Sequence, residues 1–211
     1  MSLFIKLCGI RTSAELETAV ELGVDAVGFV LTPSPRQLPL YRAAELRGQL
    51  PDHVLAVAVL HDPSPQLLRQ ADAVVGPDLF QTGLDALGDV PPDRVLPVVV
   101  DGADLESALG RALEASTRRV ALIDGAAKGG RGVPTDWARL AGLEESDRVV
   151  IAGGLTPGNV GLAVATVGPF GVDVSSGIER RPGEKDPDLM RAFVAAARAA
   201  EREGQALESN R

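Results

Sequence analysis

Short apolar runs rich in β-branched residues alternate with segments of helical periodicity along the whole chain. An apolar run of about four to eight residues is typical of a strand that is buried on both faces. Such runs predict eight strands, at residues 4–8, 26–30, 54–59, 79–81, 95–100, 119–123, 149–152 and 172–174. For the fourth strand, residues 73–75 are an alternative.

Helix start signals fall between the predicted strands. Thr12 and Glu15 have the spacing of a capping box, in which each side chain bonds the other residue's backbone amide. Ser64, Thr156 and Asp186 each precede a proline, which is typical of an N-cap followed by the first helical residue. Apolar residues at helical spacing predict three buried helix faces: Leu105, Ala108, Leu109 and Ala112; Val160, Ala163, Val164 and Val167; and Leu189, Phe193, Ala196, Ala197 and Ala200.

The repeated strand–helix unit determines the fold class. Such units place the strands in parallel and join them by right-handed crossovers. Eight units favour closure of the sheet, because closure leaves no strand at an edge. We therefore expect a single-domain (β/α)₈ TIM barrel over residues 1–200, followed by a charged C-terminal tail at residues 201–211 that frays.

Charge and composition limit the possible partners. The chain has 211 residues, of which 45% are hydrophobic and 3% aromatic, and a net charge of −8. This balance argues against nucleic acid, whose binders usually carry a basic patch. The negative net charge does not exclude a phosphorylated small molecule as substrate, because one local site is enough to bind an anion.

Cysteine and histidine are scarce. Cys8 is the only cysteine, and His53 and His61 are the only histidines. An intramolecular disulfide is therefore impossible, and a cysteine or histidine cluster for zinc is not expected. No apolar run reaches the length of a signal peptide or a membrane span, so we expect a cytoplasmic protein without a membrane partner.

Sequence motifs stand at the carboxyl ends of several predicted strands. The motifs are residues 6–11 (KLCGIR), 23–29 (GVDAVGF) with 34–36 (SPR), 122–124 (LID) with 129–132 (GGRG) and 136–137 (DW), 151–160 (IAGGLTPGNV), and 171–179 (GVDVSSGIE) with 185–186 (KD). Together, and in this order, they resemble phosphoribosylanthranilate isomerase, a family of tryptophan biosynthesis. The family usually has Gln-Leu-His-Gly after the fourth strand. This chain has Gln81 there but no histidine, so the family's substrate contacts at that loop do not carry over as a whole.

The resemblance implies a reaction. N-(5′-phosphoribosyl)anthranilate is opened and isomerised to 1-(2-carboxyphenylamino)-1-deoxyribulose 5-phosphate. An acid protonates the ribose ring oxygen, and a base then removes the proton from C2′. Neither step requires a metal or an organic cofactor, and the enzyme is expected to be a monomer or a homodimer.

Cys8 is the candidate base. Side chains alternate along a strand, so Lys6 and Cys8 share one face while Ile5 and Leu7 share the other. If Ile5 and Leu7 pack on helices, Cys8 points into the barrel near its mouth. A cation two residues away would help to lower the pKa of the thiol, which must lose its proton to act as a base.

Asp124 is the candidate acid. It follows the apolar residues of the sixth strand and so belongs at the catalytic end of a barrel. An acid must keep its proton near neutral pH, and partial burial raises the pKa of a carboxyl group in the required direction. The glycine-rich residues 129–132 beside it are predicted to be a mobile loop that acts as a lid.

The remaining candidates bind the substrate. Arg36 offers a guanidinium to the anthranilate carboxylate, and Gln81 and Asp173 are expected to contact the substrate. Barrels often bind phosphate with the loops after strands seven and eight, where glycine lets the backbone approach closely. The phosphate-binding candidates are Gly153, Gly154, Ser175, Ser176 and Gly177.

Three alternatives stay open at this point. A bifunctional isomerase that also serves histidine biosynthesis would have an aspartate in place of Cys8. Another phosphosugar barrel, such as an aldolase, would need a Schiff-base lysine, and the strand ends offer only Lys6. The third alternative is a barrel that binds a phosphorylated ligand without turnover.

Overall fold

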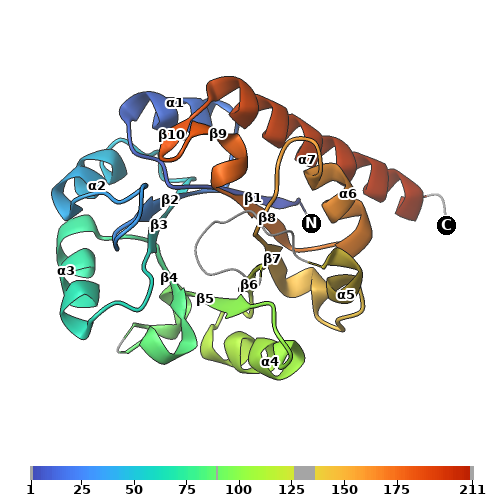
Figure 1. Ribbon diagram of the computed structural model, residues 1–211, viewed down its shortest axis with the longest axis horizontal. Helices are drawn as coiled ribbons and strands as arrows, with labels where there is room; N and C mark the ends of the chain where they lie inside the picture. The colour runs from blue at the N-terminus through green and yellow to red at the C-terminus, as the bar shows by residue number, and fades with distance from the viewer. Residues whose placement is uncertain (1, 89, 126–135, 210–211) are drawn as a thin grey trace.

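The computed structural model describes residues 2–88, 90–125 and 136–209. Within these ranges, eight parallel strands close into one barrel in chain order, and the α-helices lie around its outside (Figure 1). The predicted fold class is confirmed. The strands are β1 (Phe4–Cys8), β2 (Ala26–Val30), β3 (Leu55–Val59), β4 (Leu79–Gly83), β5 (Val95–Val100), β6 (Ala121–Asp124), β7 (Val149–Ile151) and β8 (Gly171–Val174).

The helices follow the strands, with one exception. Between β4 and β5 the described residues hold two 3-10 turns, η1 (Leu84–Ala86) and η2 (Pro92–Arg94), in place of an α-helix. Residues 73–75 lie in a helix and not in the fourth strand. The α-helices are α1 (Ser13–Glu21), α2 (Leu40–Arg47), α3 (Pro65–Val75), α4 (Leu105–Ala115), α5 (Trp137–Ala141), α6 (Val160–Val167) and α7 (Pro187–Ser209).

Three of the four predicted helix caps are confirmed. Thr12 and Glu15 form the capping box of α1, the Ser64 side chain accepts from the Leu67 amide, and Asp186 accepts from the first amides of α7. The cap at Thr156 is wrong, because α6 begins only at Val160. The Asn159 side chain accepts from the Thr156 amide and donates to the Gly154 carbonyl, so these residues form a closed loop before the helix.

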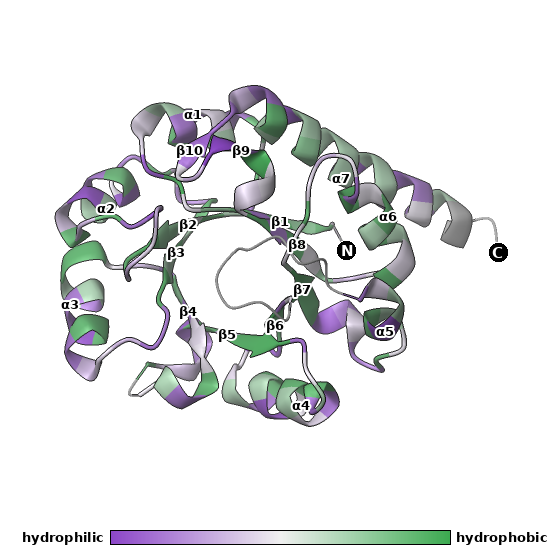
Figure 2. Cartoon of the chain, viewed as in Figure 1, coloured by the Kyte–Doolittle hydropathy of each residue, from purple (hydrophilic) through white to green (hydrophobic). Residues whose placement is uncertain are grey.

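Strand alternation divides the apolar residues into two layers. Ile5 and Leu7 belong to the outer layer, between the strands and the helices, whereas Cys8 belongs to the inner layer within the barrel. Figure 2 shows that the barrel strands are mostly hydrophobic, whereas the surrounding helices mix hydrophobic and hydrophilic residues. The predicted inward direction of Lys6 and Cys8 is confirmed.

A short hairpin follows β8 that the sequence pattern did not predict. After the 3-10 turn η4 (Ser176–Ile178), strands β9 (Glu179–Arg181) and β10 (Glu184–Lys185) pair antiparallel. The last helix, α7, continues past residue 200, and Glu201 accepts a hydrogen bond from the Leu3 amide at 2.7 Å. The predicted boundary between the domain and its tail stays a prediction. None of the helices in the described ranges is long and apolar enough to span a membrane.

Glu15 links the first helix to this hairpin. Its carboxylate accepts from the Arg11 and Thr12 amides within the cap and from the Lys185 amide of β10. The side chain is buried although it is ionisable. The cap therefore also anchors the polypeptide that covers one side of the barrel mouth.

Replacing Glu15 with Ala should destabilise the protein more than an ordinary cap deletion. We expect the free energy of unfolding to fall by about 3 kcal/mol, because three amides lose a charged acceptor. For Thr12→Ala we expect about 1 kcal/mol. Urea unfolding measures both, and Glu17→Ala, which changes an exposed residue of α1, serves as the control. Equal losses for Glu15→Ala and Thr12→Ala would contradict the link to β10.

Candidate active site

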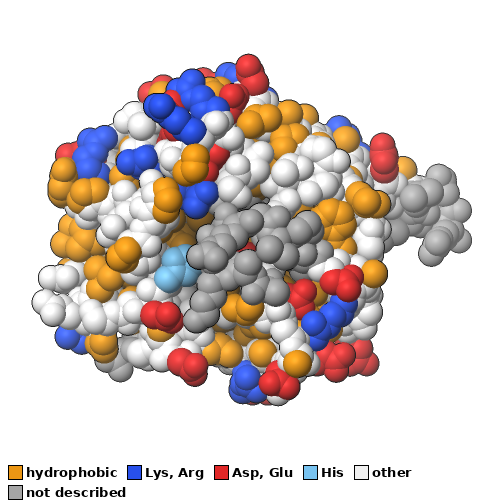
Figure 3. Space-filling view, viewed as in Figure 1, with side chains coloured by type: hydrophobic (Ala, Val, Ile, Leu, Met, Phe, Trp, Pro, Cys, Tyr) orange, Lys and Arg blue, Asp and Glu red, His pale blue; other side chains and the backbone are white. Residues whose placement is uncertain are grey.

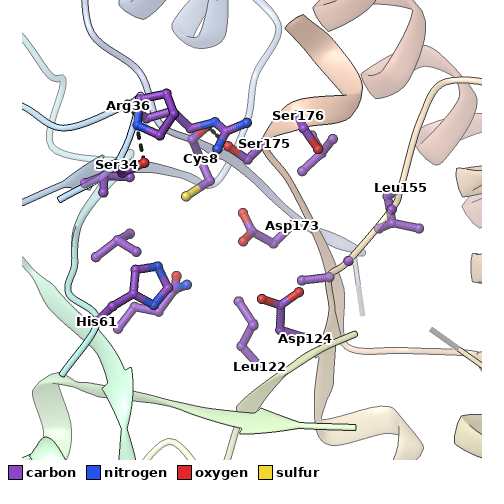
Figure 4. A pocket seen from close by; sticks show the side chains of 18 of the residues that line it. Cys8, Ser34, Arg36, His61, Leu122, Asp124, Leu155, Asp173, Ser175 and Ser176 are labelled. Carbon is purple, nitrogen blue, oxygen red and sulfur yellow. Dashed lines mark hydrogen bonds between the residues drawn. The ribbon is translucent and has the colours of Figure 1, made fainter. Parts of the chain in front are cut away.

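A cavity of about 340 Å³ opens at the carboxyl ends of the barrel strands. Figure 4 shows its side chains converging from several strands, with Cys8 and Asp124 on opposite sides. Catalytic sites of this fold lie at this end. Nine of the ten predicted site residues line the cavity: Cys8, Arg36, Gln81, Asp124, Gly153, Gly154, Asp173, Ser175 and Ser176.

Cys8 ends β1 with its thiol buried. A Cβ atom on Gly28 of the neighbouring strand would lie 2.9 Å from Cys8 Sγ, so the absence of a side chain there makes room for the thiol. Burial raises the pKa of Cys8 and Asp173 raises it further, whereas Lys6 and Lys185 lower it. The expected effect of Lys6 is present, but burial outweighs it and the pKa remains above its ordinary value.

Lys6 is itself neutralised. Its ammonium lies 2.8 Å from the Asp173 carboxylate, and both side chains are buried within the barrel. The pKa of Lys6 is raised: burial lowers it, but the combined effect of Asp173 and Cys8 is larger. Lys6 therefore stays protonated and serves as the counter-ion of Asp173.

Asp124 ends β6 and is half-buried. Its pKa is raised first by burial and then by the negative charge of Asp173, while the Gly125 amide, His61 and Lys6 lower it. A raised pKa keeps more of this carboxyl group protonated near neutral pH than an exposed aspartate would be. This is the direction that a proton donor requires.

Arg36 reaches the cavity from the loop after β2. Its Nε and Nη2 atoms donate to the two carboxylate oxygens of Glu179 at 2.7 and 2.8 Å. Gly9, with φ of 78°, gives the arginine room, since a Cβ atom there would lie 2.8 Å from Arg36 Cδ. The guanidinium is thus fixed in one orientation before any ligand binds.

The loop after β7 packs closely against the backbone on both sides, at the end of β6 and in the loop after β8. Gly153 and Gly154 have positive φ angles of 84° and 69°, and a Cβ atom on Gly153 would lie 2.6 Å from the Gly125 amide nitrogen. Gly177 does not line the cavity. A Cβ atom there would lie 1.8 Å from the Leu155 carbonyl oxygen, so Gly177 lets the two loops touch, and its predicted phosphate contact stays a prediction.

Gln81 offers an unpaired acceptor to the cavity. Its side chain is buried, and its Oε1 atom has no hydrogen-bond partner among the described residues. A buried polar atom without a partner costs about 1–3 kcal/mol, and a ligand that donates to it recovers that energy. This is the property expected of a substrate contact.

Sequence analysis missed three functional candidates. His61, two residues after the end of β3, lines the cavity, while Glu179 and Lys185 form an ion pair beside it. Glu179 and Lys185 lie in the motifs at residues 171–179 and 185–186, which could have indicated their role. His61 lies in none of the motifs, and its local sequence did not indicate a role. The predicted lid at residues 129–132 lies outside the described residues. In the described part of the chain, no group of three His, Cys, Asp or Glu side chains is placed to hold a metal ion.

Charges are unevenly spread over the face that carries the cavity. Figure 3 shows a group of Lys and Arg side chains over the β9–β10 hairpin, and more Asp and Glu than Lys and Arg side chains towards α4 and α5. The cationic side of the mouth is the side on which Arg36 and Lys185 lie. An acidic chain therefore still presents a local attraction for an anion.

Comparison with known proteins identifies the family. The family model described as N-(5′-phosphoribosyl)anthranilate (PRA) isomerase matches residues 5–196. The chain belongs to this family. The predicted isomerase of tryptophan biosynthesis is thereby confirmed.

Individual relatives agree with this assignment. The N-(5′-phosphoribosyl)anthranilate isomerase of Rhodopseudomonas palustris strain BisB5 is 40% identical, with 95% of this chain and 98% of the relative covered. The crystal structure of the Thermotoga maritima phosphoribosyl anthranilate isomerase has a TM-score of 0.79 at 32% identity, with 94% and 100% covered. A phosphoribosyl anthranilate isomerase in complex with reduced 1-(o-carboxyphenylamino)-1-deoxyribulose 5-phosphate has a TM-score of 0.74 at 31% identity, with 94% and 100% covered.

Replacing His61 with Asn should raise the pKa of Asp124 further, because it removes a positive charge that lowers that pKa. Carboxyl ¹³C chemical shifts during a pH titration measure the change directly. His53→Asn is the matched control, since the chain's other histidine lies at the opposite end of the barrel with Phe4 and Phe170. An Asp124 titration that is the same in wild type and His61→Asn would show that the imidazole does not act on this carboxyl group.

Proposed function

We propose that this isomerase uses Cys8 as its general base and Asp124 as its general acid. The observation that carries the proposal is their placement: two ionisable side chains from β1 and β6 face one cavity from opposite sides (Figure 4). A substrate that fills the cavity meets both groups at once. Each is within the barrel's mouth, where water is partly excluded and proton transfer is directed.

The reaction needs one proton donated and one removed. Asp124 protonates the ribose ring oxygen as the C1′–O bond breaks, and the nitrogen lone pair forms the C=N bond of a Schiff base. Cys8 then removes the C2′ proton. The C–H electron pair forms the C1′=C2′ bond of an enolamine, and the π pair of the C=N bond returns to nitrogen. Tautomerisation of the enolamine gives the 2′-ketone, so the oxidation at C2′ is balanced by reduction at C1′.

The two raised pKa values define the ionisation state that reacts. Catalysis requires a Cys8 thiolate together with a protonated Asp124. This form carries the same number of protons as the more abundant form, in which Cys8 is a thiol and Asp124 a carboxylate. Their ratio is therefore independent of pH between the two pKa values, and the cations that favour the thiolate increase the reactive fraction.

The substrate's three polar parts have matching partners in the cavity. Arg36 faces the anthranilate carboxylate, and the loops that hold Gly153, Gly154, Ser175 and Ser176 take the phosphate. Gln81, with its unpaired oxygen, and Asp173 are left for the ribose hydroxyls. Asp173 has a second effect in this arrangement, because its charge raises the pKa of the acid.

The aldolase-like alternative lacks support from Lys6. A Schiff-base lysine must lose its proton to attack a carbonyl. Lys6 has a raised pKa and a buried ion pair with Asp173, which keep it charged. This argues for acid–base chemistry in place of covalent catalysis by that lysine.

Oligomeric state and location complete the proposal. One Thermotoga maritima crystal structure is of monomers generated from a dimeric phosphoribosylanthranilate isomerase, and that protein is 30% identical to this chain. This similarity supports a monomer or a homodimer for this chain. A biosynthetic enzyme works where its charged intermediate is made, so we place it in the cytoplasm.

The acid and base assignments are tested by substitution. Loss of phosphoribosylanthranilate fluorescence reports turnover, and Cys8→Ser and Asp124→Asn should each lower kcat by about 10²-fold or more. Asp147→Asn, which changes an exposed carboxyl group before β7, should leave kcat unchanged. An inactive, folded wild type would overturn the function, whereas an Asp124→Asn variant that keeps a tenth of kcat would overturn the acid assignment alone.

The pH profile of kcat/KM should be a broad plateau. Activity is lost at low pH as Asp124 and Cys8 are both protonated, and at high pH as both are deprotonated. The acidic limb should lie above the ordinary aspartate value of 3.8 and the basic limb above the ordinary cysteine value of 9.0, because burial raises both pKa values. The acidic limb should follow the Asp124 titration of the wild type and of His61→Asn. A basic limb below the ordinary cysteine value would contradict the assignment of Cys8.

A further inference from the structure

The β9–β10 hairpin holds the guanidinium of Arg36 from one side. Glu179 accepts hydrogen bonds from Arg36 Nε and Nη2. The Glu179 side chain is 4% exposed and the Arg36 side chain 12% exposed. Among the described residues these are the only hydrogen bonds that the Arg36 side chain donates. The opposite edge, formed by Nη1 and the second hydrogen of Nη2, therefore remains for a second bidentate partner.

Lys185 holds Glu179 in turn. Its ammonium is fully buried and donates to Glu179 Oε1 at 2.8 Å, to the Ser175 carbonyl at 2.9 Å and to Ser175 Oγ at 3.3 Å. Ser175 Oγ also bonds the Cys8 carbonyl oxygen at 3.0 Å. One chain of contacts thus joins the arginine, the phosphate loop and the strand end that carries the thiol.

The charges in this chain of contacts do not cancel. At neutral pH Arg36 and Lys185 are positive and Glu179 is negative, so the triad keeps one positive charge. Burial lowers the pKa of Lys185 below its ordinary value, and the contact with Glu179 opposes this shift. Lys6 and Asp173, the other charged pair near the thiol, sum to zero. The triad is therefore the net positive group beside Cys8, and Lys185 lowers the pKa of that thiol.

We propose that Glu179 and Lys185 are positioning residues of this active site. Glu179 aims the free edge of Arg36 at the substrate carboxylate, and Lys185 offsets the charge of Glu179 so that the triad keeps one positive charge beside Cys8. The proposal deepens the proposed function, because it rests on the roles given there to Arg36 and Cys8. Neither residue transfers a proton to the substrate.

A purely structural role for the triad of Arg36, Glu179 and Lys185 predicts a different result. If the triad only braced the loops, removing either partner would loosen them in the same way. If its charge matters, the two substitutions act in opposite directions on the thiol. Loss of Lys185 removes a positive charge and raises the Cys8 pKa, whereas loss of Glu179 leaves two positive charges and lowers it.

The titration of Cys8 provides this test without any turnover. Cys8 is the only cysteine, so the ultraviolet absorbance of its thiolate can be followed with pH, using Cys8→Ser as the blank. We expect a raised pKa in Lys185→Met, a lowered one in Glu179→Gln, and a value near wild type in the double variant, which again keeps one positive charge. Lys185→Arg, which keeps a positive charge at every pH of the titration, should not raise the pKa of Cys8. Shifts of the same sign in both single variants would overturn the proposal.

Two controls keep the result interpretable. Arg181→Gln changes the charge of the same hairpin at an exposed side chain and should leave the titration unchanged. Removing one partner of a buried ion pair is destabilising, so Lys185→Met is compared only where circular dichroism shows it folded. If Lys185→Met does not fold, Glu179→Gln and the double variant still test whether removing the charge of Glu179 lowers the pKa of Cys8.

Kinetics test the positioning of Arg36. In Glu179→Gln the guanidinium loses its bidentate partner, so we expect KM to rise about tenfold or more, with a smaller change in kcat. An unchanged KM would overturn the positioning role. An inactive wild type would instead remove the proposed function, while the opposite shifts of the Cys8 titration would still be measurable, so the two failures are distinguishable.

Discussion

Closure of the sheet is the constraint on which this protein depends. Each strand must pair on both sides, and β1 pairs in register with both β2 and β8. Closure fixes the alternation of every strand at once: Ile5 and Leu7 must face the helices, so Lys6 and Cys8 must face inward. The same register sets Lys6 opposite Asp173 and Cys8 opposite Gly28. The buried ion pair and the space for the thiol therefore follow from closure.

Most of the fold could be predicted because its signals are local. Buried strands, helix faces and the capping box of Thr12 and Glu15 involve residues that are near one another in sequence. The failed cap at Thr156 shows the limit of such rules, since the nearby Asn159 offers the backbone competing hydrogen bonds. Local residue types alone do not show which of two competing patterns is more stable.

The site residues that could be predicted are those at the ends of strands and those in the motifs of the family resemblance. Cys8, Asp124 and the glycine loops stand at strand ends, where the barrel guarantees a place at the mouth. The partner of Arg36 is 143 residues away in sequence, and no local pattern indicates that pairing. His61 was missed for a related reason: an exposed residue after a strand acquires meaning only from what faces it across the barrel. The pKa of Cys8 is decided by burial, which a neighbouring lysine in the sequence does not reveal.

The Glu15 carboxylate has a consequence for the synthesis of the chain. The ribosome synthesises Glu15 near the start of the chain. One of the amides that donate to its carboxylate belongs to Lys185, which is synthesised 170 residues later. In the same way, β1 cannot pair with β8, and the Leu3 amide cannot donate to Glu201, until those residues have been synthesised. A nascent chain on the ribosome can form helices and neighbouring strand pairs as it emerges, but its first strand keeps an open edge. Until β8 leaves the exit tunnel, the growing chain lacks Asp173, Ser175 and Ser176, so the cavity is incomplete during most of translation.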